Sequence, residues 1–153
     1  MTSRITMAIV VAVAVPAAAC GATVPAPATL DTAHDACTYC RMIVSDRRFA
    51  SQIVAPLEEP KFFDDLGCLA NHLKTSGTLP ARTIVYVADH ATLEWVPARD
   101  AVFTRVDTLT APMGSHVIAH ASGATRRTDP AAATGTPVEQ RELFPAGLPG
   151  GTR

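Results

Sequence analysis

The chain has 153 residues, of which 48% are hydrophobic and 18% are charged, and its formal net charge is −1. This length predicts one domain or two very small ones. With so little net charge the chain has no surplus of basic residues for binding phosphate backbones, so we exclude nucleic acid as a partner.

The first 19 residues are typical of an export signal. Arg4 precedes an unbroken apolar run over residues 7–15, which is too short for a permanent membrane helix and suits the central region of a signal peptide. Alanines at 17–19 then lead directly to Cys20. We therefore predict a lipoprotein signal peptide over residues 1–19, with Cys20 lipidated and anchoring the protein to a membrane of the cell envelope, outside the cytoplasm. The alternative is ordinary cleavage at the same alanines, which leaves Cys20 as a free thiol.

Small residues dominate both ends of the remaining chain. Residues 20–30 are small, uncharged and rich in proline, and they predict a flexible tether. Residues 122–153 consist mainly of Gly, Ala, Thr, Pro and Arg, and they predict a largely disordered tail. Within this tail the sequence TPVE at 136–139 is typical of a helix start, so we expect a short helical turn that reaches Phe144. The folded body is expected over residues 31–121.

The first half of this body predicts two strands and a helix. Residues 49–54 and 61–63 are rich in β-forming side chains and predict strands. Asp64 or Asp65 is expected to cap a helix that runs through Lys74. One apolar stripe along this helix is formed by Leu66, Leu69 and Leu73.

The second half predicts strands alone, over residues 83–88, 93–96, 101–106 and 116–120. The first two of these flank a short polar turn and predict a β-hairpin. Together the elements predict an α+β fold of short antiparallel strands, arranged as two small successive ββα-like units over about 31–80 and 81–121.

The cysteine count points to an unpaired thiol. Four cysteines are present, at Cys20, Cys37, Cys40 and Cys68. If Cys20 carries lipid, three remain, and an odd number in an exported protein leaves at least one thiol without a disulfide partner. A free thiol is a liability in an oxidising compartment, and a bound metal is one way of occupying it.

The methionines indicate which metal. Only Met42 and Met113 remain once the signal is removed, and both lie in loop-like stretches rather than in apolar runs. Met42 completes a C-x2-C-x-M sequence with Cys37 and Cys40. Thiolate and thioether sulfurs are soft donors that select Cu(I), so we predict a Cu(I) site formed by these four residues. His116, three residues after Met113, is a further candidate ligand.

Two other arrangements use the same cysteines. Cys37, Cys40, Cys68 and His72 have a spacing that allows a tetrahedral zinc site, which needs neither methionine. A disulfide between two of the cysteines is the second alternative. Cys68 shares its helix with the leucine stripe, so we expect it to be mainly structural and rank it low among the copper ligands. The sequence contains none of the common catalytic motifs, and we expect no enzyme.

Several segments in a fixed order resemble the NosL family of nitrous-oxide-reductase accessory lipoproteins. They are DACTYCRMIVSDRRFASQIV, KFFDDLGCLANHLK, YVADHATLEWVPARDAVF and APMGSHVIAHAS, and they cover nearly all of residues 35–122. The resemblance implies two small ββα-like units and one Cu(I) bound through sulfur ligands outside the cytoplasmic membrane. By position, Cys40, Met42 and Met113 match the family's motifs, and Cys20 matches its lipidated cysteine.

One residue departs from the family pattern. Arg41 stands where many members have Gly, and we expect it to restrict the loop and to favour deprotonation of the neighbouring thiols. The resulting hypothesis is a membrane-anchored Cu(I) metallochaperone. It receives copper from a membrane protein and delivers it to an extracytoplasmic copper enzyme, nitrous oxide reductase or a related client. The alternative is an exported binding module stapled by zinc or a disulfide.

Overall fold

The computed structural model describes residues 24–149. The predicted signal peptide and the lipidated Cys20 lie outside the described residues and stay predictions. Within residues 24–149, none of the helices is both long and apolar enough to span a membrane.

The first sheet has four antiparallel strands in the order β2-β1-β3-β4. Their bounds are Ser51–Val54 for β1, Lys61–Phe63 for β2, Ile84–Ala88 for β3 and Trp95–Pro97 for β4. A short 3-10 helix, η1 (Arg47–Phe49), precedes β1. β3 and β4 form the predicted hairpin, and all four strands lie within or beside the segments that the sequence predicts.

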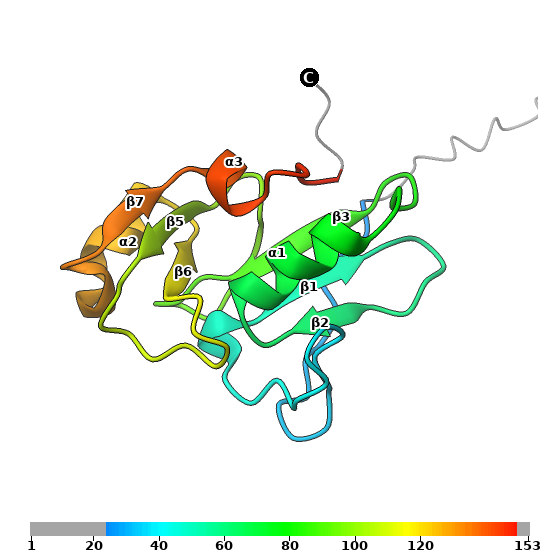
Figure 1. Cartoon of the computed structure of the whole chain (residues 1–153), viewed down its shortest axis with the longest axis horizontal. Coiled ribbons are helices and arrows are strands. Elements are labelled where there is room, and N and C mark those ends of the chain that lie inside the picture. The colour runs from blue at the N-terminus through cyan, green and yellow to red at the C-terminus, as the bar shows by residue number, and fades with distance from the viewer. Residues whose placement is uncertain (1–23, 150–153) are drawn as a thin grey trace, which may run out of the picture.

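Helix α1 (Leu66–Thr75) packs against β1 and β2 and also contacts the second sheet (Figure 1). Its N-cap is Asp65, whose side chain accepts a hydrogen bond from the backbone of Gly67. An N-cap of this kind satisfies an amide that the helix itself cannot pair. The predicted cap and the leucine stripe are therefore confirmed, and the buried residues of the helix are Leu66, Cys68, Leu69, Ala70 and Leu73.

The second sheet has three antiparallel strands in the order β6-β5-β7. Its strands are β5 (Val102–Arg105), β6 (Val117–His120) and β7 (Thr136–Val138). Helix α2 (Gly123–Thr128) and the 3-10 helix η2 (Pro130–Ala132) connect β6 to β7, and α3 (Gln140–Leu143) follows β7. The two sheets share one hydrophobic core, to which the second sheet contributes Phe103, Val117, Ala119 and Val138.

The α+β class is confirmed. The boundary between the two sheets, however, does not fall between residues 80 and 81 as predicted. β3 and β4 pair into the first sheet, so the chain passes to the second sheet only after Pro97. The physical reason is that β3 (Ile84–Ala88) is buried over most of its length and pairs on both sides, with β1 and with β4.

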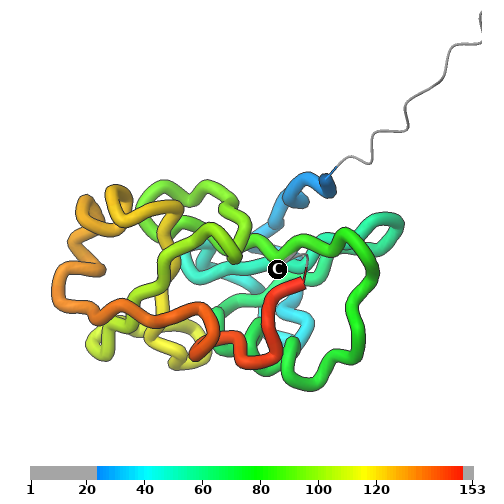
Figure 2. Tube along the Cα trace, turned by 90° about the horizontal axis from the view of Figure 1, so that it is seen from above, coloured from blue at the N-terminus to red at the C-terminus, as the bar shows by residue number. Residues whose placement is uncertain are grey.

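The predicted disordered tail is wrong for residues 122–149. β7 pairs with β5, and the ring of Phe144 packs edge-on against Phe103 with centroids 5.7 Å apart. The chain then returns from the second sheet towards the first (Figure 2). The expected helical turn is present as α3, whereas Thr136–Val138 form a strand instead. The segment contains few large apolar residues, so its composition predicted disorder. Two of those residues, Val138 and Phe144, are nevertheless buried in the core and hold the segment in place.

The predicted flexible tether is likewise wrong for residues 25–30. The buried amide of Gln52 exchanges two hydrogen bonds with the backbone of Ala28, and the hydroxyl of Tyr86 donates to the carbonyl of Pro25. Gln52 and Tyr86 are direct partners across β1 and β3, so they hold this segment against one face of the first sheet. A polar Gln in the middle of a strand needs such a partner because burial without one is costly.

Candidate metal centre

The C-x2-C-x-M sequence forms a closed loop. The amide of Cys37 donates to the carbonyl of Met42 at 2.7 Å, and the amide of Arg41 donates to the carbonyl of Cys37 at 2.9 Å. A third bond, from the amide of Thr38 to the carbonyl of Phe62 at 2.8 Å, fixes the loop to β2. The loop is thus held at the strand end that leads into helix α1.

Arg41 adopts a left-handed backbone conformation, with φ of 69°. A side chain with a Cβ is strained there, whereas glycine is not. A glycine at position 41 would adopt this conformation without that strain. The loop keeps its shape with Arg at some cost in stability.

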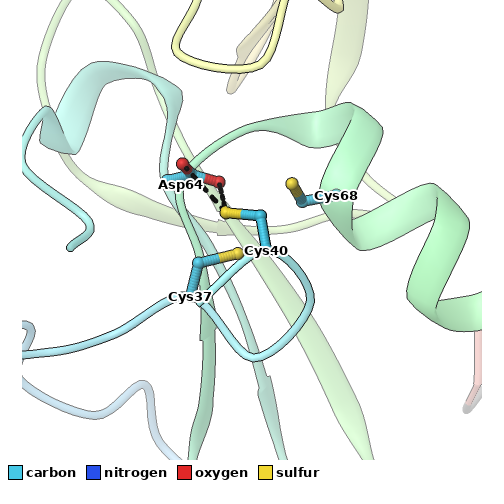
Figure 3. A group of neighbouring side chains, drawn as sticks. All are labelled: Cys37, Cys40, Asp64 and Cys68. Carbon is cyan, nitrogen blue, oxygen red and sulfur yellow. Dashed lines mark hydrogen bonds between the residues drawn. The ribbon is translucent and has the colours of Figure 1, made fainter. Parts of the chain in front are cut away.

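Four ligand groups meet beside this loop. The thiols of Cys37, Cys40 and Cys68 and the carboxylate of Asp64 have ligand atoms that all lie within 4.8 Å of one another (Figure 3). We call these four residues the Cys3Asp cluster. Cys37 and Cys40 come from the loop, Asp64 follows β2, and Cys68 lies in the first turn of α1. All three cysteines are free thiols.

Burial raises the pKa of the Cys40 thiol, and the neighbouring Cys37 and the Asp64 carboxylate act in the same direction, whereas the N–H of Met42 opposes them. The Cys40 thiol donates to both Asp64 oxygens, at 3.4 and 3.5 Å. Burial and Asp64 also raise the pKa of Cys68. Desolvation and the neighbouring acidic groups thus set the direction of the Cys40 shift, and the expected effect of Arg41 on the thiols stays a prediction.

The backbone of Met113 is hydrogen-bonded to Asp65, the residue that follows the cluster member Asp64. Met113 lies in the loop between β5 and β6, and its amide donates to Asp65 Oδ2 at 3.3 Å, as does the amide of Ser115 at 3.2 Å. Gly67 allows this close approach, since a Cβ there would lie 3.2 Å from the Cβ of Ser115. The side chains of Met42 and Met113 are each 47% exposed.

Two candidate nitrogen ligands lie outside the cluster. His116 does not belong to it, and its Nδ1 donates to the carbonyl of Leu109 at 2.7 Å. His72 packs its ring against Phe63, with centroids 5.0 Å apart, and burial lowers its pKa. The structure therefore brings together the three cysteines of the zinc alternative but places Asp64, not His72, beside them.

Sequence reasoning missed Asp64 as a cluster member. Asp64 and Asp65 are adjacent, and the sequence offers both as one helix cap. In the structure only Asp65 caps α1, while Asp64 is buried against the thiols. The two adjacent aspartates were a usable sign of this role. A helix cap needs only one carboxylate, so the other aspartate is free for a different function.

A second buried group contains His90, His120 and Asp129. Asp129 Oδ2 accepts from His90 Nδ1 at 2.6 Å and from His120 Nε2 at 2.9 Å. The opposite ring nitrogens are buried and have no hydrogen-bond partner among residues 24–149. A metal bound on the Asp129 side would put N–H groups at those two positions, where no acceptor is available. The arrangement fits a hydrogen-bonded connection between segments better than a metal site.

Comparison with protein families finds that the NosL family model matches residues 27–141. The matched segment includes the whole Cys3Asp cluster and both methionines. No curated protein and no solved structure matches the chain.

Proposed function

Because this chain belongs to the NosL family, a family of copper-related accessory proteins rather than of known enzymes, we propose that it is a Cu(I) metallochaperone. In this proposal the protein binds one Cu(I) as cargo and delivers it to an extracytoplasmic copper enzyme, nitrous oxide reductase or a related client. A membrane protein supplies the copper, and lipid on Cys20 holds the chaperone at the membrane. NosL proteins are typically extracytoplasmic, which agrees with this setting.

The observation that carries the proposal is the group of three free thiols with sulfur atoms within 4.8 Å of one another. Soft sulfur donors select Cu(I), and Cu(I) accepts few ligands without strong geometric demands. Cys37 and Cys40 supply thiolates from one closed loop. Met42 and Met113 supply exposed thioethers from two loops that both contact the start of α1 or the strand before it.

Partial exposure suits a carrier. Metal that passes to another protein must be reachable by that protein's ligands, and Cys40 is only half-buried while Met42 and Met113 are exposed. Neutral thioethers bind Cu(I) less strongly than thiolates, which permits release. A permanently closed structural site has no need of such exposed ligands.

A competition titration tests the proposed ligands. Reduced protein is titrated anaerobically with Cu(I) in the presence of a chromophoric Cu(I) chelator. We expect Cys40→Ser to lose most of the affinity and Met113→Ala a smaller but measurable part, with Met42→Ala similar to Met113→Ala. If both methionine variants and their double variant hold Cu(I) like the wild type, the carrier site does not include the thioethers.

The position of Asp64 beside the three thiols favours a second candidate function, an exported binding module whose fold is stabilised by a structural zinc ion. Three thiolates and a carboxylate form a donor set that tetrahedral Zn²⁺ accepts. The two candidates differ in their need for thioethers and in the effect of Asp64→Asn. This variant weakens Zn²⁺ binding if the carboxylate is a ligand, and it leaves a sulfur-bound Cu(I) largely in place.

A further inference from the structure

The sulfur ligands differ sharply in exposure, and Cys40 stands between the two extremes. Cys37 and Cys68 are buried, with 0% and 2% of their surface exposed, whereas Met42 and Met113 are each 47% exposed. Cys40 is intermediate. The five sulfurs thus form a series from the protein interior to its surface.

Rigid elements hold the buried thiols. Cys68 projects from the first turn of α1, which is anchored by the Asp65 cap and by the leucines of the core. Cys37 is fixed by its backbone bonds to Met42 and Arg41. With Cys40, these thiols have sulfur atoms close enough to share one metal ion after small side-chain rotations.

The exposed thioethers belong to two loops that are each hydrogen-bonded to the segment from β2 to the start of α1, one at Phe62 and the other at Asp65. Met42 follows Cys40 by two residues, and its N–H favours the Cys40 thiolate. The backbone of Met113 is bonded to Asp65, the residue that follows Asp64 in the chain, and the Asp64 carboxylate accepts from the Cys40 thiol. Methionine has three rotatable bonds, so both exposed thioethers can adopt several orientations.

We propose that the metal centre has two levels that share Cys40. An inner level of three thiols, from Cys37, Cys40 and Cys68, retains the metal, and an outer level, formed by Cys40 with Met42 and Met113, passes it on. This inference rests on the proposed Cu(I) function and adds Cys68 to the ligands. It assigns opposite roles to the buried and the exposed sulfurs.

The physical basis is the difference between the two kinds of donor. Three thiolates, two of them from buried cysteines, bind Cu(I) tightly and hold it away from competing ligands. Replacing two of them by neutral thioethers weakens the bond and brings the metal to the surface. Each ligand exchange keeps the bond to Cys40, so the metal never has to leave the protein before an acceptor's ligand arrives.

Two measurements on the full-length reduced protein test the two levels separately. The first is equilibrium Cu(I) affinity by chelator competition, and the second is the rate of Cu(I) transfer to an added excess of the same chelator, measured by stopped flow. The variants are Cys68→Ser for the inner level and Met42→Leu/Met113→Leu for the outer level. Leucine is close to methionine in volume but carries no sulfur.

We expect opposite effects on the transfer rate. Cys68→Ser lowers the affinity by roughly tenfold or more and speeds transfer, because it removes one thiolate that retains the metal. The double leucine variant changes the affinity less and slows transfer, because it removes the exit ligands. X-ray absorption should show one sulfur fewer around copper in Cys68→Ser and no such loss in the leucine variant.

Leu73→Ala is the matched control, since Leu73 is buried on the same helix but outside the Cys3Asp cluster. It should lower stability without changing affinity or rate. Cys68→Ala provides a second inner variant if serine is poorly tolerated. Wild-type protein that binds no Cu(I) overturns the proposed function itself. Wild type that binds Cu(I), with Cys68→Ser and Cys68→Ala indistinguishable from it, overturns only the two-level centre.

Discussion

At the scale of single residues, the loop that carries two of the thiols is shaped by a position that favours glycine. Arg41 has a φ of 69°, and its amide completes the loop by bonding to the Cys37 carbonyl. For a residue with a Cβ this conformation costs about 1–2 kcal/mol. The sequence alone gives no sign of this strain, and only the backbone angle explains why glycine suits the site.

Arg41→Gly should therefore stabilise the reduced, metal-free protein by about 1 kcal/mol, since relief of strain exceeds the entropic cost of glycine in the unfolded chain. Arg41→Ala is the control, because it removes the same charge but keeps the strain. Urea unfolding followed by circular dichroism measures both. If the two variants are equally stable, the left-handed conformation does not strain this loop.

At the scale of elements, one carboxylate joins a helix to the loop of Met113. Asp65 caps α1 through Gly67 and also accepts from the amides of Met113 and Ser115. The cap was predictable, because an acidic residue just before an apolar stripe is a standard helix start. The bonds to Met113 were not, since they join residues 48 positions apart and no local pattern records them.

We expect Asp65→Ala to lower the free energy of unfolding by about 2 kcal/mol, through loss of the cap and of the two loop bonds. It should also weaken Cu(I) binding about as much as Met113→Ala does, and the double variant should be no weaker than either single one. Asp65→Asn keeps an acceptor oxygen and serves as the control. Fully additive losses in Cu(I) affinity would show that Asp65 does not position Met113.

Much of the first sheet and of α1 could be predicted from the sequence because their signals are local. Their strands and helix carry clear periodicity, and Asp65 marks the helix start. The Cys3Asp cluster could be predicted only in part, because Asp64 and Cys68 approach Cys37 and Cys40 through the packing of α1 on β2. The C-terminal segment was hidden by its composition, and its place depends on the pairing of β7 with β5.

At the scale of the whole molecule, Asp89 connects the two sheets. It directly follows β3, and one of its oxygens accepts from the amide of Ala121 at 2.7 Å, just beyond β6. The other oxygen accepts from the amides of Ala91 and Thr92. Burial opposes the charge on Asp89, but these N–H groups together outweigh it, and the pKa of Asp89 is lowered from its usual value of 3.8.

A lowered pKa in the folded state makes stability depend on pH. The contribution of ionised Asp89 is fully present above its unfolded pKa and is lost as pH falls through the lower folded pKa. Urea unfolding of wild type and Asp89→Asn between about pH 6 and pH 2 should show the wild-type advantage shrinking below about pH 4. An advantage that stays constant over this range would mean that the charge on Asp89 does not join the sheets.

We propose that this NosL protein carries Cu(I) on its cysteine and methionine sulfurs. The most direct measurement is the metal content of reduced protein, purified without oxygen from cells supplied with both copper and zinc. We predict one copper per chain with little zinc, and loss of that copper in Cys37→Ser/Cys40→Ser. One zinc per chain with no copper, or copper that the double variant retains, would contradict the claim.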